Sequence, residues 1–261
     1  MPFDVVKYQE IGADIDKSLI KNDIKSQPMI VAATKQQGES DIIQAINAGI
    51  THFGENRVQE ALEKWPHIKE SYPDMTLQMI GGLQSNKAEA AVDLFDEILT
   101  VDRESLAKAL KKAMDKLIVD CPEGAKDDTK QLPKAAVLRA EGSEMRHIHC
   151  DEYGLKKTKR PNLMIQVNIG EEPQKSGVLP SDADDFIHYC KDELELPIVG
   201  LMCVPPADAY PAPYFALLAT IAKRHNLQRL SMGMSRDYGA AIRMGATEVR
   251  LGTVLFGKRA V

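Results

Sequence analysis

Eight short apolar runs alternate with amphipathic, charge-bearing segments along the 261-residue chain. Runs of this kind, almost free of charge, are typical of strands in a parallel sheet that is covered on both faces. Strict strand–helix alternation requires parallel pairing with right-handed crossovers, and eight such units close a (β/α)8 TIM barrel of about 250 residues. The predicted strands are 29–34, 52–55, 76–81, 97–101, 162–169, 198–204, 229–234 and 248–256.

Helical patterns fill the intervals between these runs and complete the α/β fold class. A further helix, 5–24, precedes the first strand and is predicted to cover the bottom or the flank of the barrel. An open, doubly wound sheet is the alternative, but the turn after the first strand lacks the Gly-x-Gly-x-x-Gly pattern usual there. The helices between strands are predicted at 40–48, 56–64, 85–94, 103–117, 181–194, 212–225 and 237–244.

Residues 118–160 interrupt this rhythm between the fourth inter-strand helix and the fifth strand. They span 43 residues where a few would suffice. Pro and Gly residues argue against one long helix, although 134–145 is predicted to form a short one. His147, His149 and Cys150 are spaced too compactly for a familiar metal site, so no metal is predicted. We expect a surface insertion on the bottom face of a single domain, 1–261.

Composition excludes several classes of protein. The net charge of −5 and the pI of about 5.7 lack the basic footprint of a nucleic-acid binder. No apolar segment approaches the roughly 18 residues needed to span a bilayer, and the start of the chain lacks a signal-peptide pattern. The four cysteines form no Cys-x-x-Cys pair, which favours reduced thiols. These features predict a soluble, cytoplasmic protein that binds neither nucleic acid nor membrane.

Lys35 directly follows the first apolar run, 28–34, which contains no charged residue. In α/β barrels the carboxyl ends of the strands build the active face, and a lysine there can form a Schiff base. Taken alone, a solvated loop lysine is the more ordinary interpretation. The residues that follow the seventh and eighth strands favour the Schiff-base interpretation instead.

Glycine and hydroxyl residues follow the seventh and eighth strands, where barrels commonly bind phosphate. Gly233 and Gly252 allow close backbone approach, and Ser231, Ser235 and Thr253 supply hydroxyl donors. Either loop alone is consistent with an ordinary glycine turn. Together, at those two strands, they favour a phosphate site.

Arg250 shares one face of the eighth strand with Gly252, because side chains alternate along a strand. An inward arginine needs a partner. That partner is either a ring nitrogen of a ligand or an internal carboxylate such as Glu55 or Asp102. A phosphate anchor, a ring-nitrogen partner and an imine-forming lysine together describe pyridoxal 5'-phosphate (PLP).

Several stretches carry a family resemblance, among them 30–35, 52–61, 80–87, 230–235 and 249–253. They resemble the pyridoxal phosphate homeostasis proteins, whose fold is similar to the barrel domain of alanine racemase. The resemblance implies that Lys35 carries PLP as an imine, that Asn56 lies beside the cofactor and that Arg250 faces the pyridine nitrogen. By the same resemblance the phosphate would be surrounded by Ser231, Met232, Gly233, Ser235, Gly252 and Thr253. The chain departs from the family at 36–38, which predicts a looser loop after Lys35, and at Gly82, which predicts a more mobile loop after the third strand. The insertion has no counterpart in the family, and no function is predicted for it.

The resemblance implies a carrier rather than an enzyme. A racemase of this fold needs a second domain that supplies a catalytic tyrosine, and only four residues follow Gly257. We therefore expect a monomer or weak dimer that holds PLP for intracellular homeostasis and delivery, with PLP-dependent apo-enzymes as candidate recipients and with no catalytic residues. Two alternatives stay open: a fold-type III amino-acid racemase or decarboxylase, and a Schiff-base aldolase acting on a phosphosugar.

Overall fold

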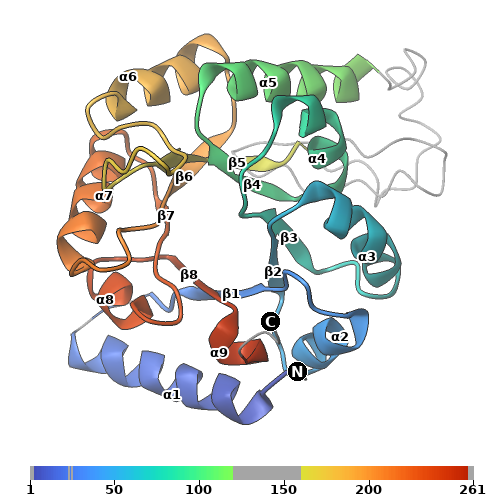
Figure 1. The fold of residues 1–261 in the computed structure, drawn as a ribbon, viewed down its shortest axis with the longest axis vertical. Helices are drawn as coiled ribbons and strands as arrows, with labels where there is room; N and C mark the ends of the chain where they lie inside the picture. Colours follow the sequence, from blue (N-terminus) through green and yellow to red (C-terminus); the bar gives the residue numbers. More distant parts are fainter. Residues whose placement is uncertain (1–2, 23, 25, 120–159, 258–261) are drawn as a thin grey trace, which may run out of the picture.

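Eight parallel strands close into a barrel in the order β1 to β8, and β1 pairs with β8 to complete the ring. The computed structural model describes residues 3–22, 24, 26–119 and 160–257. Helices surround the ring of strands (Figure 1). The predicted (β/α)8 fold is thereby confirmed and the open-sheet alternative is excluded.

The strands begin where the apolar runs begin, and most of them end earlier than predicted. The clearest correction concerns the predicted strand 248–256. That strand ends at Leu251, and after Gly252 the chain turns into a short helix, with Leu255 N and Phe256 N donating to Gly252 O. The observed strands are β1 Met29–Ala33, β2 His52–Glu55, β3 Thr76–Met79, β4 Glu97–Val101, β5 Asn162–Val167, β6 Ile198–Cys203, β7 Arg229–Ser231 and β8 Glu248–Leu251.

The helices form where the amphipathic patterns predict them, with shifts of a few residues at their ends. The predicted helix 56–64 is the largest shift, because α3 begins at Val58 and continues to Ser71. The observed helices are α1 Val5–Lys21, α2 Glu39–Asn47, α3 Val58–Ser71, α4 Ala88–Leu94 after the 3-10 turn η1 Ser85–Lys87, α5 Glu104–Val119, α6 Ala183–His188 continuing into η4 Tyr189–Glu193, α7 Ala212–Arg224, α8 Tyr238–Arg243 and α9 Thr253–Phe256.

The N-terminal helix α1 covers the flank of the barrel, not its bottom. Its buried Ile11 and Ile15 face inward, and the helix packs against α8 and α9 (Figure 1). Asp4 caps its first turn, while the rings of Phe3 and Phe256 lie 5.6 Å apart. The start of the chain is therefore attached to the helix that follows β8.

Most of the predicted insertion, including the predicted helix 134–145, lies outside the described residues. Helix α5 continues to Val119, two residues into the predicted insertion. At its other end Arg160 Nη2 lies 3.2 Å from Asp115 Oδ1 on α5. The surface position of 118–160 and the single-domain organisation stay predictions.

Hydrophobic side chains fill two regions. The larger core lies between the outer faces of the strands and the helices, and it includes Trp65, which is fully buried with its ring 5.2 Å from that of Phe53. A smaller cluster of Leu99, Met164 and Met202 is separate from it. Because side chains alternate along each strand, this second cluster fills the middle of the barrel interior.

Candidate cofactor site at the barrel mouth

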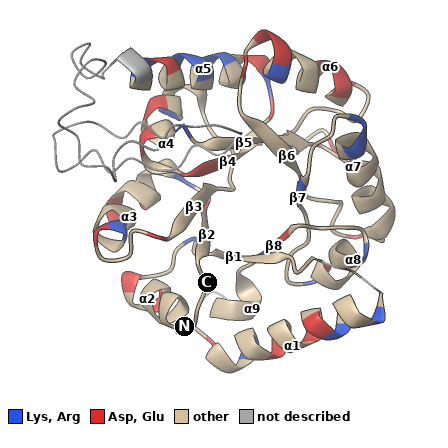
Figure 2. Cartoon of the chain, turned by 180° about the vertical axis from the view of Figure 1, so that it is seen from behind, with Lys and Arg blue, Asp and Glu red and all other residues tan. Residues whose placement is uncertain are grey.

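The floor of the barrel interior is a polar network formed by the first residues of β4, β7 and β8 and by Gln78 of β3. Arg229 on β7 contacts Glu97 on β4 at 2.5 and 2.8 Å and Glu248 on β8 at 2.9 Å. Gln78 on β3 donates to the same two carboxylates at 2.7 and 3.2 Å. Figure 2 shows the acidic residues on β4 and β8 and the basic residue on β7. We call these four residues the floor network.

Glu97 and Arg229 stay charged in the floor network although both are largely buried. Burial by itself would raise the pKa of Glu97, but the Arg229 guanidinium outweighs burial and holds that pKa below its usual value. Burial would lower the pKa of Arg229, and Glu97 and Glu248 reverse that effect and raise it. The floor arginine is thus paired with protein carboxylates on two strands.

Arg250 on β8 lies higher in the barrel and has different partners. Its side chain is 6% exposed, Nη1 donates to Ser231 Oγ at 2.6 Å, and Nη2 donates to the Cys203 carbonyl at 2.9 Å. The two carboxylates considered from the sequence are not its partners, because Glu55 pairs with Lys64 and Asp102 with Arg103. The alternative of an internal carboxylate partner, Glu55 or Asp102, was therefore wrong.

The guanidinium of Arg250 retains capacity to bind a ligand. Burial lowers its pKa, and its hydrogen bonds go to a hydroxyl and a carbonyl instead of carboxylates. A guanidinium carries five N–H donors, so two such bonds leave others for a further acceptor. A neutral ring nitrogen is an acceptor of that kind.

Two glycines form the loops after β7 and β8. Gly233 has φ +93°, and a Cβ there would lie 2.5 Å from the Ala241 Cβ, so the position excludes other residues. Arg250 N donates to Gly233 O at 2.9 Å, which joins the loop after β7 to strand β8. A Cβ on Gly252 would lie 3.3 Å from that of Ala33. The second glycine therefore abuts β1 two residues before Lys35.

Lys35 and Asn56 follow adjacent strands at the same level. Ala33 pairs with Gly54, and Thr34 N donates to Gly54 O. Thr34 points away from the barrel interior, where its hydroxyl donates to Glu55, so alternation directs Lys35 toward the mouth. Both Lys35 and Asn56 are half-buried.

The structure gathers most of the predicted site residues on one arc of the mouth, formed by β2, β1, β8 and β7 in that order. Met232 differs, because its side chain is fully buried in the outer core, so only its backbone can face a ligand. Thr253 is exposed at the beginning of α9, and Ser235 is half-buried after Gly233. Within the described part of the chain, which leaves out His147, His149 and Cys150, no group of His, Cys, Asp and Glu residues is placed to hold a metal ion.

A cleft of about 240 Å³ occupies the opposite arc of the mouth. Lys175 in this cleft donates to the Pro205 carbonyl at 3.0 Å, and Gln166 donates to the Ser176 carbonyl at 2.9 Å. The sequence interpretation did not assign these residues to the site, although Gln166 lies near the end of β5 and Lys175 follows it. The cleft is lined by Ile80, Gly82, Gln166, Val167, Asn168, Lys175, Ser176, Met202 and Val204.

The chain matches the family of the alanine racemase N-terminal domain over residues 18–260. It is 31% identical to the pyridoxal phosphate homeostasis protein of Pasteurella multocida, over 90% of this chain and 88% of that protein. The chain belongs to this family. The homologous protein of Vibrio cholerae is also 31% identical, over 90% of this chain and 87% of its own length. The resemblance read from the sequence is therefore confirmed.

Solved structures agree with the family assignment. PipY of Synechococcus elongatus without PLP superposes with a TM-score of 0.69 at 30% identity, covering 93% of this chain and 100% of PipY. PipY with PLP bound gives a TM-score of 0.66 at 29% identity with the same coverage. Alanine racemase from Corynebacterium glutamicum, at 14% identity and a TM-score of 0.58, covers 94% of this chain and 61% of the racemase, and shares the fold. None of the helices in the described residues has the length and apolar character needed to cross a bilayer.

Proposed function

We propose that this protein binds PLP as an imine on Lys35 and holds it for intracellular PLP homeostasis. The names of the relatives and the PLP-bound PipY structure support the cofactor. The observation that carries the proposal is the close approach of Gly252 to Ala33, because it sets the loop after β8 beside the end of β1, two residues before Lys35. An anion held by that loop lies next to the amine.

The residues on the arc fit the parts of the cofactor. The loops at Gly233 and Gly252 offer close backbone approach to the phosphate, and Arg250 offers a buried donor to the pyridine nitrogen. With PLP bound there, the Lys35 amine would be the group that condenses with the aldehyde, with loss of water, to hold the cofactor as an imine. Asn56, beside Lys35, orients the ring from the β2 side.

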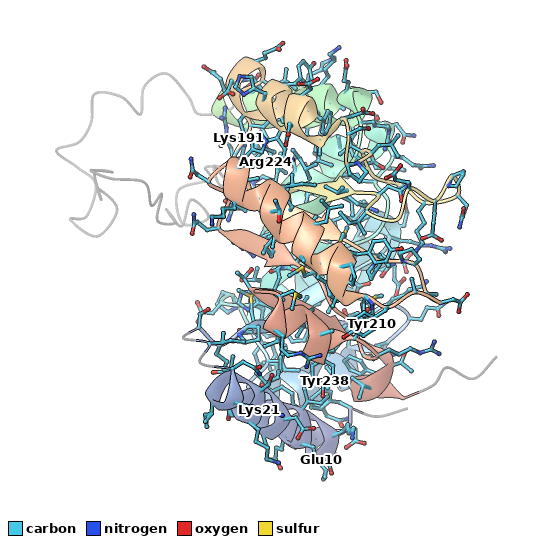
Figure 3. The ribbon with its side chains drawn as sticks, turned by 90° about the vertical axis from the view of Figure 1, so that its left-hand side faces the viewer. Glu10, Lys21, Lys191, Tyr210, Arg224 and Tyr238 are labelled. Atoms are coloured by element: carbon cyan, nitrogen blue, oxygen red, sulfur yellow. The ribbon has the colours of Figure 1, made fainter. Side chains whose placement is uncertain are left out.

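Holding PLP suits this site better than turnover. An arginine that donates to the pyridine nitrogen disfavours its protonation and so weakens the ring as an electron sink. Tyr238, the tyrosine nearest the end of β7 in the sequence, lies on α8 beside α1 (Figure 3), where burial and then Asp14 raise its pKa. Its hydroxyl is thus directed to the flank. We propose apo-enzymes as recipients, a cytoplasmic location and a monomer or weak dimer, as the sequence predicts.

Visible imine absorption tests the proposal. Wild-type protein incubated with PLP should absorb in the visible range, and Lys35→Ala should lose that absorption, whereas Lys112→Ala, on the exposed face of α5, should retain it. A phosphosugar aldolase would show no such absorption in any variant. Holo-protein that racemises or decarboxylates an amino acid at about 1 per second or faster would contradict the carrier function.

A further inference from the structure

A buried charged network lies behind Lys35, on the outer face of the barrel. Glu55, at the end of β2, is fully buried. Its Oε1 accepts from the Thr34 hydroxyl at 2.8 Å and from Trp65 Nε1 at 3.1 Å, and Lys64 Nζ lies 2.8 Å away. A buried carboxylate needs a counter-charge and hydrogen bonds. Two hydrogen bonds and one ion pair supply them at Oε1, whereas Oε2 has no hydrogen-bond partner among the described residues. The network lies one residue from the proposed imine lysine.

The Lys64 ammonium joins this carboxylate to the backbone on both sides of Lys35. It donates to the Thr34 carbonyl at 3.2 Å and, at the distance limit of such bonds, to the Gln37 carbonyl at 3.4 Å. It also pairs with Glu60, one turn earlier on α3, at 3.0 Å. Residues before and after Lys35 are therefore held by one side chain of α3.

Glu60 holds the residue directly after Lys35. Its Oε1 accepts from Gln36 N at 2.5 Å. Burial alone would raise the pKa of Glu60, but the Gln36 amide and Lys64 outweigh burial and lower it, so the side chain stays a carboxylate near neutral pH. Gln36 has φ +61°, a left-handed conformation that residues with a side chain adopt only when their surroundings impose it. The carboxylate of Glu60 supplies that constraint.

We propose that Glu55, Glu60 and Lys64 form a clamp that positions the Lys35 amine for reaction with an aldehyde. The clamp fixes the backbone at Thr34, Gln36 and Gln37, and the direction of the Lys35 side chain follows from that backbone. The three residues act through Lys35 and are positioning residues. The proposal rests on the imine function proposed above and deepens it. It also explains how a loop with Gln36-Gln37-Gly38 after the lysine is kept in place.

Glu60 is the residue to change, because it is the most exposed member of the clamp, at 22% of its side chain. Lys64→Met would leave Glu55 buried without a counter-charge and could fail to fold. Glu60→Ala removes the acceptor for Gln36 N. Glu60→Gln keeps an oxygen in the same place, and Glu63→Ala changes an exposed glutamate of the same helix as the matched control.

The first measurement is borohydride trapping of PLP on Lys35 over a range of PLP concentrations, scored by peptide mass. Glu60→Ala should raise the half-saturating PLP concentration about tenfold, the scale of one lost charge-assisted hydrogen bond. Glu60→Gln should recover most of the affinity, and Glu63→Ala should match wild type. A loss in Glu60→Ala that the Gln variant does not recover would contradict the clamp.

Two further measurements need no PLP and so separate the clamp from the proposed function. Hydrogen exchange at the Gln36 amide should be slow in wild type and at least tenfold faster in Glu60→Ala. Reductive methylation of Lys35 by formaldehyde, relative to that of Lys112, should slow in the same variant. If wild type traps no PLP on Lys35, but Glu60→Ala still shows faster exchange at Gln36 and slower methylation of Lys35, the proposed function is overturned and the clamp is not. Unchanged exchange and methylation in Glu60→Ala, even with a lower melting temperature, would overturn the clamp.

Discussion

Two arginines inside the same barrel, Arg229 at the floor and Arg250 near the mouth, have opposite environments. The floor arginine meets one carboxylate from the neighbouring strand β8 and one from β4 across the barrel, and its pKa is raised. The mouth arginine meets a hydroxyl and a carbonyl, and its pKa is lowered by burial. A cation already neutralised by protein carboxylates stabilises the fold, whereas one with neutral partners is available to a ligand. This difference supports the cofactor site proposed at the mouth.

The largest expected effect comes from removing the floor cation. Arg229→Met leaves Glu97 and Glu248 buried without their cation, and we expect the free energy of unfolding to fall by about 3–5 kcal/mol. Denaturant unfolding measures this change. The control is Arg224→Met, whose pair with Asp184 is half-exposed and should contribute about 0–1 kcal/mol. Equal losses of unfolding free energy in Arg229→Met and Arg224→Met would show that the floor network does not stabilise the fold.

Removing the mouth cation should affect binding more than folding. Arg250→Met leaves no carboxylate unpaired, and we expect PLP to bind about 10- to 100-fold more weakly, since a hydrogen bond to a charged group contributes about 1.5–3 kcal/mol. Absorbance titration with PLP measures the affinity. The loss of unfolding free energy should be smaller than in Arg229→Met. Wild-type affinity in this variant would remove Arg250 from the site.

The smallest effect is a pH dependence of the floor network. The pKa of Glu97 is lowered in the folded protein, so its contribution is present above the unfolded pKa of about 4.3 and is lost as pH falls through the folded value. In Arg229→Met burial dominates and raises that pKa instead. The difference in unfolding free energy between wild type and the variant should therefore narrow as pH falls from 7 toward 3. A constant difference would mean that Glu97 is not held ionised by Arg229.

Sequence patterns predicted the elements of the barrel because its strands are covered on both faces and read as apolar runs. The bounds of β2 and β4 matched, since turn and polar residues flank both strands. The end of β8 was wrong because Gly252 turns the chain, with φ −120° and ψ −80°, and apolar Val254, Leu255 and Phe256 continue the hydrophobic pattern into α9. Hydrophobicity alone does not distinguish a strand from a short buried helix.

The positions of candidate site residues could be predicted where they depend on strand ends, whereas contacts between distant side chains were missed. The strand pattern and its alternation place Lys35 and Arg250, and Asn56 follows the strand next to that of Lys35. Their roles in binding stay predictions. The contacts of Glu60 and Lys64 with the turn after β1 join residues 24 and 30 positions apart, and their separation in the sequence gives no signal of this. The alternative of an internal carboxylate as the partner of Arg250 was wrong because Glu55 faces the outside of the barrel.

Borohydride reduction of the PLP-loaded protein, followed by peptide mapping, shows directly whether PLP is attached to Lys35. If PLP is held as an imine on Lys35, we expect one phosphopyridoxyl group per chain, on the peptide that contains Lys35. The same peptide from the Lys35→Ala protein should be unmodified. Bound PLP whose label falls on other lysines, with Lys35 unmodified, would contradict the account.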